Sequence, residues 1–364
     1  MPNFVRLLIF LLFLSNLGSA QAPPEFSAGF STVHLIDSYR IYKSETPDSH
    51  PLHYRPLDLD VWYPSERSQS GSALLFEDLF RLHEARADTY QEETDYKGFS
   101  EELIMYLAAG FGLEPMDGKR LLKKPTQSYR DATVLEGRFP LILYMAGYNG
   151  MGWESYRLLE ALAERGFVVV SIASVGRYPG DMTNSLENTM EQVLDAEYAL
   201  QYLETTETFP VDMSKKGIVG LSWGGMSGIL LLDRQPDFQA MVSLDGSDTF
   251  YYGETAQDDQ DLSEIFAAGV LHPKQTTAAF FHLEAGDRLE GFIPTGVYRY
   301  YEQVNGPIRY VRFLRSRHED FSSLGWALAA SEERTVRYEN IVRATSLFLE
   351  KHLKAKPGFD AYYD

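Results

Sequence analysis

Cysteine is absent from this sequence of 364 residues. Its absence excludes a disulfide framework, a thiol nucleophile and a lipid-modified cysteine. Long apolar runs are also missing. The apolar run near the start, Leu7–Leu14, is well short of the about 20 residues that a membrane-spanning helix needs, and no later segment could span a bilayer.

The first 20 residues have the order of a secretory signal peptide: Arg6, then the short apolar run, then small residues up to Ala20. A membrane anchor is the alternative, but the apolar run is too short for one. Cleavage after Ala20 would leave residues 21–364, which suit one large α/β domain with an insertion. The sequence therefore predicts a secreted or periplasmic protein, and the missing cysteine favours a bacterial envelope.

Positive charge is also scarce. The chain has 33 Lys and Arg against 52 Asp and Glu, a formal net charge of −19. Such an acidic chain is a poor partner for nucleic acid and for anionic membranes. A neutral small-molecule substrate, or one that is bound locally, fits this charge better. The oligomeric state is not indicated.

From Phe139 onward, buried strands alternate with amphipathic helices. We expect strands at 140–145, 167–173, 217–220, 238–244, 277–283 and 308–314, and helices at 153–165, 186–203, 225–233, 297–303 and 332–353. Earlier strands are expected at 31–37 and 57–63, and a polar loop runs from 245 through 261. This alternation predicts an α/β fold with a mostly parallel central sheet and helices on both faces.

Residues from about 74 to 133 have a different pattern, because they are mostly charged, have helical periodicity and show no strand signal. Leu75, Leu79 and Leu82 have helical spacing, and so do Leu103 and Leu107. We interpret this stretch as a helical insertion that lies over the main domain. The alternative is a solvent-exposed loop region without a functional role.

The run Gly220-Leu-Ser-Trp-Gly224 has the pattern Gly-x-Ser-x-Gly. Such a run holds a serine on a strained turn between a strand and a helix, with its hydroxyl exposed. The required context is present, since a short buried strand precedes the run and an apolar helix follows it. Glycines are needed because side chains beside the serine would crowd the turn. The motif predicts Ser222 as a nucleophile.

A serine hydroxyl needs a base to take its proton, normally a histidine held by a carboxylate. In chains with this turn, the acid and then the histidine follow the serine. Of the histidines after Ser222, His272 falls in a loop, His282 in a buried strand and His352 in the terminal helix. His318 comes just past the last predicted strand, at the strand end where an open α/β sheet places its site. It is the predicted general base.

Two aspartates could hold that histidine. Asp245 directly follows the strand 238–244, and Asp287 follows the next strand, 277–283. A carboxylate at the end of an apolar strand needs a hydrogen-bonded or charged partner, and a histidine that becomes cationic would supply one. On the residues alone, Asp245 and Asp287 stay alternatives.

A tetrahedral intermediate at the serine would also need two backbone N–H donors. The residue after the nucleophile, Trp223, supplies the first. The second should come from the loop after strand 140–145, where Tyr148 follows Ala146 and Gly147. An ordinary tight turn is the alternative interpretation of this loop.

These elements together resemble the α/β-hydrolase superfamily, in particular its dienelactone-hydrolase-like and platelet-activating-factor-acetylhydrolase-like branch. The matching pieces span most of the mature chain: Asp58–Pro64, Phe139–Gly147, Val219–Gly225, Val242–Gly246 and His318–Phe321. The resemblance implies an α/β-hydrolase fold and an exported serine hydrolase that cleaves carboxylic esters, with a small-molecule or lipid-like ester as its substrate.

The resemblance also bears on the acid. In the acetylhydrolase family the acid follows the strand after the nucleophile helix, which favours Asp245, whereas in most other branches it follows the next strand and would be Asp287. The family often has His-Gly in the loop after strand 140–145, where this chain has Ala146-Gly147. Any role of that histidine is therefore absent, but the backbone donor at Tyr148 is unaffected.

Two other functions fit the same residues. An amide or peptide hydrolase uses the same triad, and a non-catalytic protein with this fold could bind a ligand or partner. No cofactor motif is present, and no metal site is expected. His50 and His53 lie in a proline-broken loop, and Asp258–Asp261 is better explained as a solvated acidic loop than as a calcium site.

Overall fold

The structure is a computed structural model that describes residues 24–66, 72–90, 98–176, 182–251, 256–287, 296–328 and 331–363. The predicted signal peptide, residues 1–20, lies outside the described residues. Among the helices that are described, none has both the length and the apolar character needed to cross a membrane.

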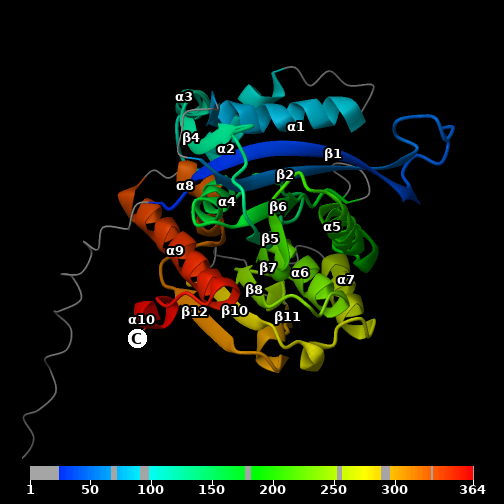
Figure 1. Cartoon of the computed structure of the whole chain (residues 1–364), viewed down its shortest axis with the longest axis vertical. Coiled ribbons are helices and arrows are strands. Elements are labelled where there is room, and N and C mark those ends of the chain that lie inside the picture. The colour runs from blue at the N-terminus through cyan, green and yellow to red at the C-terminus, as the bar shows by residue number, and fades with distance from the viewer. Residues whose placement is uncertain are drawn as a thin grey trace, which may run out of the picture.

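A ten-stranded sheet forms the centre of the molecule (Figure 1). The pairings from β12 to β6 are all parallel, whereas β2 is antiparallel to both of its neighbours. The strands lie side by side in the order β12 (Ile308–Phe313), β10 (Ala279–Ala285), β8 (Ala240–Leu244), β7 (Val211–Leu221), β5 (Phe139–Met145), β6 (Val168–Ile172), β2 (Tyr54–Ser65), β1 (Ser27–Ile41), β4 (Pro125–Arg130) and β3 (Ser72–Leu75).

Helices cover both faces of the sheet, and each face has its own apolar core. One core packs α4 (Tyr156–Ala163), α9 (Glu332–Lys354) and the insertion against the sheet; the other packs α5 (Leu186–Thr205), α6 (Trp223–Arg234) and α7 (Ala256–Ala267). Strand β6, Val-Val-Val-Ser-Ile, is buried along its whole length because helices cover both of its faces. The predicted α/β fold, with a mostly parallel sheet between helices, is confirmed.

The insertion contains three helices, α1 (Phe76–Tyr90), α2 (Phe99–Gly110) and α3 (Pro115–Leu122), which lie over β1 in Figure 1. The expectation that this stretch has no strand was wrong. Strand β4 pairs in parallel with β1, and β3 pairs with β4, so the two strands extend the edge of the sheet. Their sequences, Ser-Ala-Leu-Leu and Pro-Thr-Gln-Ser-Tyr-Arg, have little strand pattern. Pairing at the edge of the sheet, β4 with β1 and β3 with β4, decides their conformation.

Two other local predictions were wrong. Residues 245–261 are not only a loop, since they contain β9 (Phe250–Tyr251) and the start of α7. Residues 297–303 are not an α-helix, since β11 (Gly296–Val297) is followed by a short 3₁₀ helix, η2 (Tyr300–Gln303). The backbone N–H groups of Tyr298 and Arg299 both donate to the carbonyl oxygen of Thr249, and β11 pairs with β9. Contacts with another segment of the chain therefore replace the helical hydrogen bonds.

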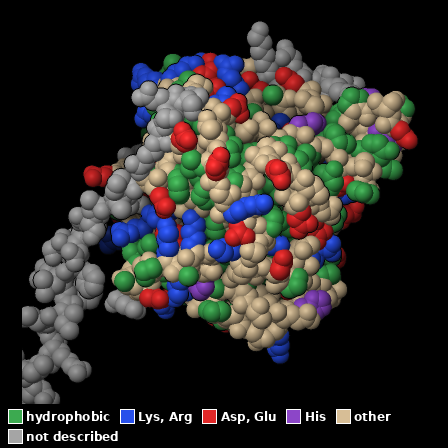
Figure 2. Space-filling view, viewed as in Figure 1, with side chains coloured by type: hydrophobic (Ala, Val, Ile, Leu, Met, Phe, Trp, Pro, Cys, Tyr) green, Lys and Arg blue, Asp and Glu red, His purple; other side chains and the backbone are tan. Residues whose placement is uncertain are grey.

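The remaining described elements are short. They are η1 (Pro273–Gln275), η3 (His318–Phe321), α8 (Ser323–Ala327) and α10 (Phe359–Tyr363). On the face shown in Figure 2, acidic side chains are scattered and interleaved with basic ones. The negative charge is therefore spread over this face and not gathered in one patch.

Candidate active site

Ser222 lies on a sharp turn between β7 and α6. Its φ of 53° and ψ of −121° fall in a region that costs a residue with a side chain about 1–3 kcal/mol. The flanking glycines are required by packing. A Cβ on Gly224 would lie 2.0 Å from the carbonyl oxygen of Met145, and one on Gly220 would lie 2.3 Å from that of Gly224. Because these atoms belong to the backbone, they cannot move aside, and only glycine fits either position.

The structure brings Ser222, His318 and Asp245 together. His318 Nε2 lies 2.9 Å from the Ser222 hydroxyl oxygen, and His318 Nδ1 lies 2.6 Å from Asp245 Oδ2. An ionised carboxylate can only accept a hydrogen bond, so Nδ1 carries the proton and donates it to Asp245. Nε2 is then the acceptor that faces the serine hydroxyl, which is the arrangement a general base requires.

Asp245 directly follows β8 and is 1% exposed. Its φ of 47° turns the chain sharply at this point. Its second oxygen, Oδ1, accepts a hydrogen bond of 2.8 Å from the backbone N–H of Ala285, at the end of β10. Both carboxylate oxygens therefore have hydrogen-bond partners, which offset the free-energy cost of burying this charge.

Asp287, the other candidate acid, lies elsewhere. Its backbone N–H donates to the carbonyl oxygen of Ser316, and its side chain borders a polar cavity that is also lined by Arg315, Arg317 and Arg334. Between Asp287 and His318, both within the described residues, the structure shows no hydrogen bond or ion pair. The geometry thus brings His318 to Asp245 and not to Asp287.

His318 begins η3, just past β12, and is half-buried. Burial by itself lowers the pKa of His318, but the hydrogen bond and the negative charge of Asp245 outweigh it and leave the pKa above its ordinary value. The turn is fixed by Asp320, which accepts hydrogen bonds from the backbone of Arg317 and from the guanidinium of Arg334 on α9. The backbone turn that carries His318 is therefore held in place by Asp320.

Among the described residues, none of the other three late histidines hydrogen-bonds to Ser222. His282 is fully buried in β10, where its Nδ1 lies 3.3 Å from Asp248 Oδ2 and its ring stacks on Tyr301. His352 lies in α9, and burial lowers its pKa. His272 precedes η1. His50 and His53 belong to the loop between β1 and β2, and no cluster of potential metal ligands is found in the described part of the chain.

The loop after β5 lies directly against the serine. A Cβ on Gly147 would lie 3.4 Å from Ser222 Cβ, so the backbone that leads to Tyr148 passes close to the Ser222 side chain. The loop is held in place: Gly150 N–H donates to the carbonyl oxygen of Gly147, and the amide of Gln192 donates to that of Ala146. Tyr148 follows Gly147 in this loop, and Trp223 directly follows Ser222 as the first residue of α6.

Glu154, which was not predicted from the sequence, holds this loop in place through hydrogen bonds. Its Oε1 accepts hydrogen bonds from the backbone N–H of Gly147, at 2.7 Å, and from the Tyr144 hydroxyl, at 2.9 Å. Burial raises the pKa of Glu154 to about 7, although both hydrogen bonds and the nearby His318 oppose the rise. A lone glutamate before a helix carries no motif, so only its position in the fold shows this role.

The strand order and the turn at Ser222 define an α/β-hydrolase fold. Among solved structures, the chain is similar to the ferulic acid esterase from Streptomyces cinnamoneus, with a TM-score of 0.62 and 17% sequence identity over 93% of this chain and 94% of that one. No known family profile matches the sequence, and no curated protein does. At this low identity the likeness bears on the fold alone.

Proposed function

We propose that the protein is a serine hydrolase that cleaves carboxylic esters through an acyl-enzyme. One observation carries the proposal: the hydrogen-bonded series from the Ser222 hydroxyl through both ring nitrogens of His318 to the buried carboxylate of Asp245. The strained turn and the two glycines that permit it support the same role for Ser222.

In the proposed first step, Ser222 Oγ attacks the ester carbonyl carbon while His318 Nε2 takes the hydroxyl proton. Asp245 stabilises the imidazolium that forms and keeps the ring in the required tautomer. The carbonyl oxygen becomes an oxyanion, and we assign the backbone N–H groups of Trp223 and Tyr148 as its donors. His318 then gives the proton to the leaving alcohol.

In the second step, water replaces the alcohol. His318 takes a proton from the water, the resulting hydroxide attacks the acyl carbon, and the proton passes to Ser222 Oγ as the acid leaves. Each residue thus returns to its starting state. Apart from this water, the scheme uses only side chains and backbone groups of the chain itself.

An ester is favoured over an amide as the substrate for two reasons. The solved structure that the fold resembles is an esterase by name, and the sequence motifs resemble esterases of the acetylhydrolase branch. The triad chemistry itself allows both bonds, since ester and amide hydrolases share it.

A substrate panel tests the proposal. We expect the purified protein to turn over p-nitrophenyl acetate and butanoate, to leave p-nitroanilide peptides nearly untouched, and to be labelled by a fluorophosphonate probe at Ser222. Preferential turnover of the anilides would favour a peptidase. Neither labelling nor turnover, from a folded protein, would favour the non-catalytic alternative.

Glu154 provides a separate prediction about the second oxyanion donor. In Glu154→Ala the Gly147 N–H loses its acceptor, so the loop that carries Tyr148 can shift, and a shift of about 1 Å can cost up to about 100-fold in rate. We expect kcat to fall by about 10- to 100-fold with little change in KM. Glu154→Gln keeps an acceptor oxygen, and we expect it to restore most of the activity.

Glu160 is the matched control, because it lies in α4, the helix that begins just after Glu154, is fully buried and also has a pKa raised by burial to about 7. Its Oε1 accepts from the backbone of Gln127 and from the Ser128 hydroxyl, on the far side from Ser222. Glu160→Ala should lower the unfolding temperature but leave kcat of the folded protein unchanged. Equal losses of kcat in the two alanine variants would contradict the role of Glu154.

A further inference from the structure

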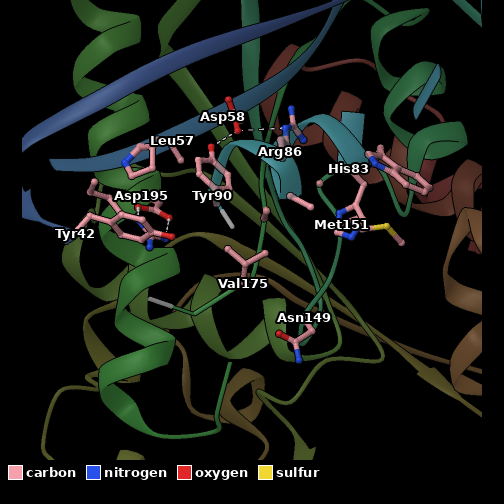
Figure 3. Close-up of a pocket in the computed structure, with 16 residues that line it drawn as sticks. Tyr42, Leu57, Asp58, His83, Arg86, Tyr90, Asn149, Met151, Val175 and Asp195 are labelled. Atoms are coloured by element: carbon pink, nitrogen blue, oxygen red, sulfur yellow. Dashed lines mark hydrogen bonds and ion pairs between the residues drawn. The ribbon is translucent and has the colours of Figure 1, made fainter. Parts of the chain in front are cut away.

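A cavity of about 90 Å³ lies between α1 of the insertion and the carboxyl ends of β5 and β6 (Figure 3). Asn149 and Met151 border it from the loop after β5, Val175 from the segment after β6, and His83, Arg86 and Tyr90 from α1. Figure 3 shows these side chains arranged around a common space. The cavity is therefore built jointly by the insertion and by the loop that lies against Ser222.

The sheet order places this cavity on one side of Ser222 and the base on the other. Ser222 follows β7; Asp245 follows β8 and His318 follows β12, toward one edge of the sheet. The cavity lies over β5, β6 and β2, toward the opposite edge. Since His318 must give its proton to the leaving alcohol, the alcohol lies on the His318 side. An acyl chain bound to Ser222 on the side away from His318 would then extend in the direction of the cavity.

The charged groups around the cavity compensate one another. Arg86 donates two hydrogen bonds to Asp60, of 2.6 and 2.9 Å, and its Nε lies 3.3 Å from Asp58. Arg55 donates to Asp195 at 2.8 Å. A charged ligand would find no unbalanced charge to pair with, and it would have to leave water.

The other walls are apolar or aromatic. Leu57, Ala87, Met151, Trp153 and Val175 contribute apolar surface, and the Tyr42 and Tyr90 rings meet edge to face with centroids 6.5 Å apart. Burial, and then the charge of Arg86, lower the pKa of His83, so its imidazole is neutral near pH 7. An uncharged apolar group suits these walls.

The size of the cavity sets the length of that group. An apolar cavity of about 150 Å³ accommodates benzene. This cavity, at about 90 Å³, is smaller, so its size favours a short straight chain over an aromatic ring. We propose that this cavity binds the acyl chain of the substrate, which we infer to be an ester of a short, straight-chain, uncharged acid such as butanoic acid.

This inference rests on the proposed function, and the test separates the two. For the wild type we expect kcat/KM for p-nitrophenyl butanoate to exceed that for the acetate by about tenfold, since two more methylene groups are buried. The cinnamate, whose acyl chain carries a ring, should fall below the butanoate. Absence of all turnover would argue against the proposed function, whereas acetate turnover without a butanoate preference, or with a cinnamate preference, would overturn the cavity assignment alone.

Substitutions on α1 test whether the cavity determines the preference for butanoate over acetate. Ala87 borders the cavity and is 8% exposed, so in Ala87→Phe the added ring fills it, and we expect the butanoate-to-acetate ratio to fall about tenfold. Ala85, two residues earlier, is exposed, and Ala85→Phe should leave the ratio at its wild-type value. An equal change of the ratio in both variants would contradict the assignment.

A second variant enlarges the cavity from β2 in case Ala87→Phe does not fold. Leu57→Ala removes three carbon atoms from the opposite wall, and we expect the best substrate to move from the butanoate to the hexanoate. An unchanged order of preference in a folded Leu57→Ala variant would overturn the proposal.

Discussion

Ser222→Ala is expected to lower kcat/KM for p-nitrophenyl butanoate by at least about 10⁴-fold, which corresponds to about 5 kcal/mol of transition-state stabilisation. The loss is large because no other group can form the acyl-enzyme, and the remaining donors can only assist direct attack by water. The variant should also fail to react with a fluorophosphonate probe. Stopped assays of ester hydrolysis and probe labelling measure the two effects.

Ser227 supplies the control for this substitution. It lies in the same helix, α6, is fully buried, and its hydroxyl has no hydrogen-bond partner among the described residues. Ser227→Ala should therefore preserve turnover and keep or slightly raise the unfolding temperature. Turnover by Ser222→Ala at a tenth of the wild-type rate or more would exclude Ser222 as the nucleophile.

Asp245→Asn is expected to lower kcat by about 10⁴-fold while the fold is retained. The asparagine has the same shape, but its amide group can donate toward Nδ1. The proton of His318 would then move to Nε2, where it blocks proton transfer from Ser222. Asp287→Asn should change kcat little, because Asp287 lies beside the arginine-lined cavity and not against the imidazole. A larger loss in Asp287→Asn than in Asp245→Asn would reverse the assignment of the acid.

The pH profile gives an independent measure of the same contact. Turnover needs a neutral His318, so kcat/KM should be present above its pKa and be lost as the pH falls through it. Burial lowers this pKa, whereas Asp245 raises it to give a net upward shift. Removing the carboxylate should therefore move the acid limb of the residual activity to lower pH. An acid limb that stays in place would show that Asp245 does not act on His318.

The main elements and the turn at Ser222 could be predicted because their signals are local. Buried parallel strands such as Val168–Ile172 are continuous apolar runs, and Gly-x-Ser-x-Gly is a short motif with one backbone solution. The strands β3 and β4 were missed because β3 is only four residues long, β4 is mostly polar, and both form by pairing at the edge of the sheet, β4 with β1 and β3 with β4. The segment 297–303 was misassigned for the same reason, since its hydrogen bonds go to Thr249.

The sequence by itself determined the alternation of the main buried strands and helices from Phe139 onward, the strained turn at Ser222 and the position of His318 past the last strand. On the residues alone, Asp245 and Asp287 stayed alternatives because both end strands, and a strand end does not specify which neighbour it faces; only the family resemblance favoured Asp245. The tertiary structure decided the contact of Asp245 with His318, the brace that Glu154 provides for the loop before Tyr148, and the cavity under α1. These depend on distances between residues far apart in the chain, which only the packing of the folded sheet and helices fixes.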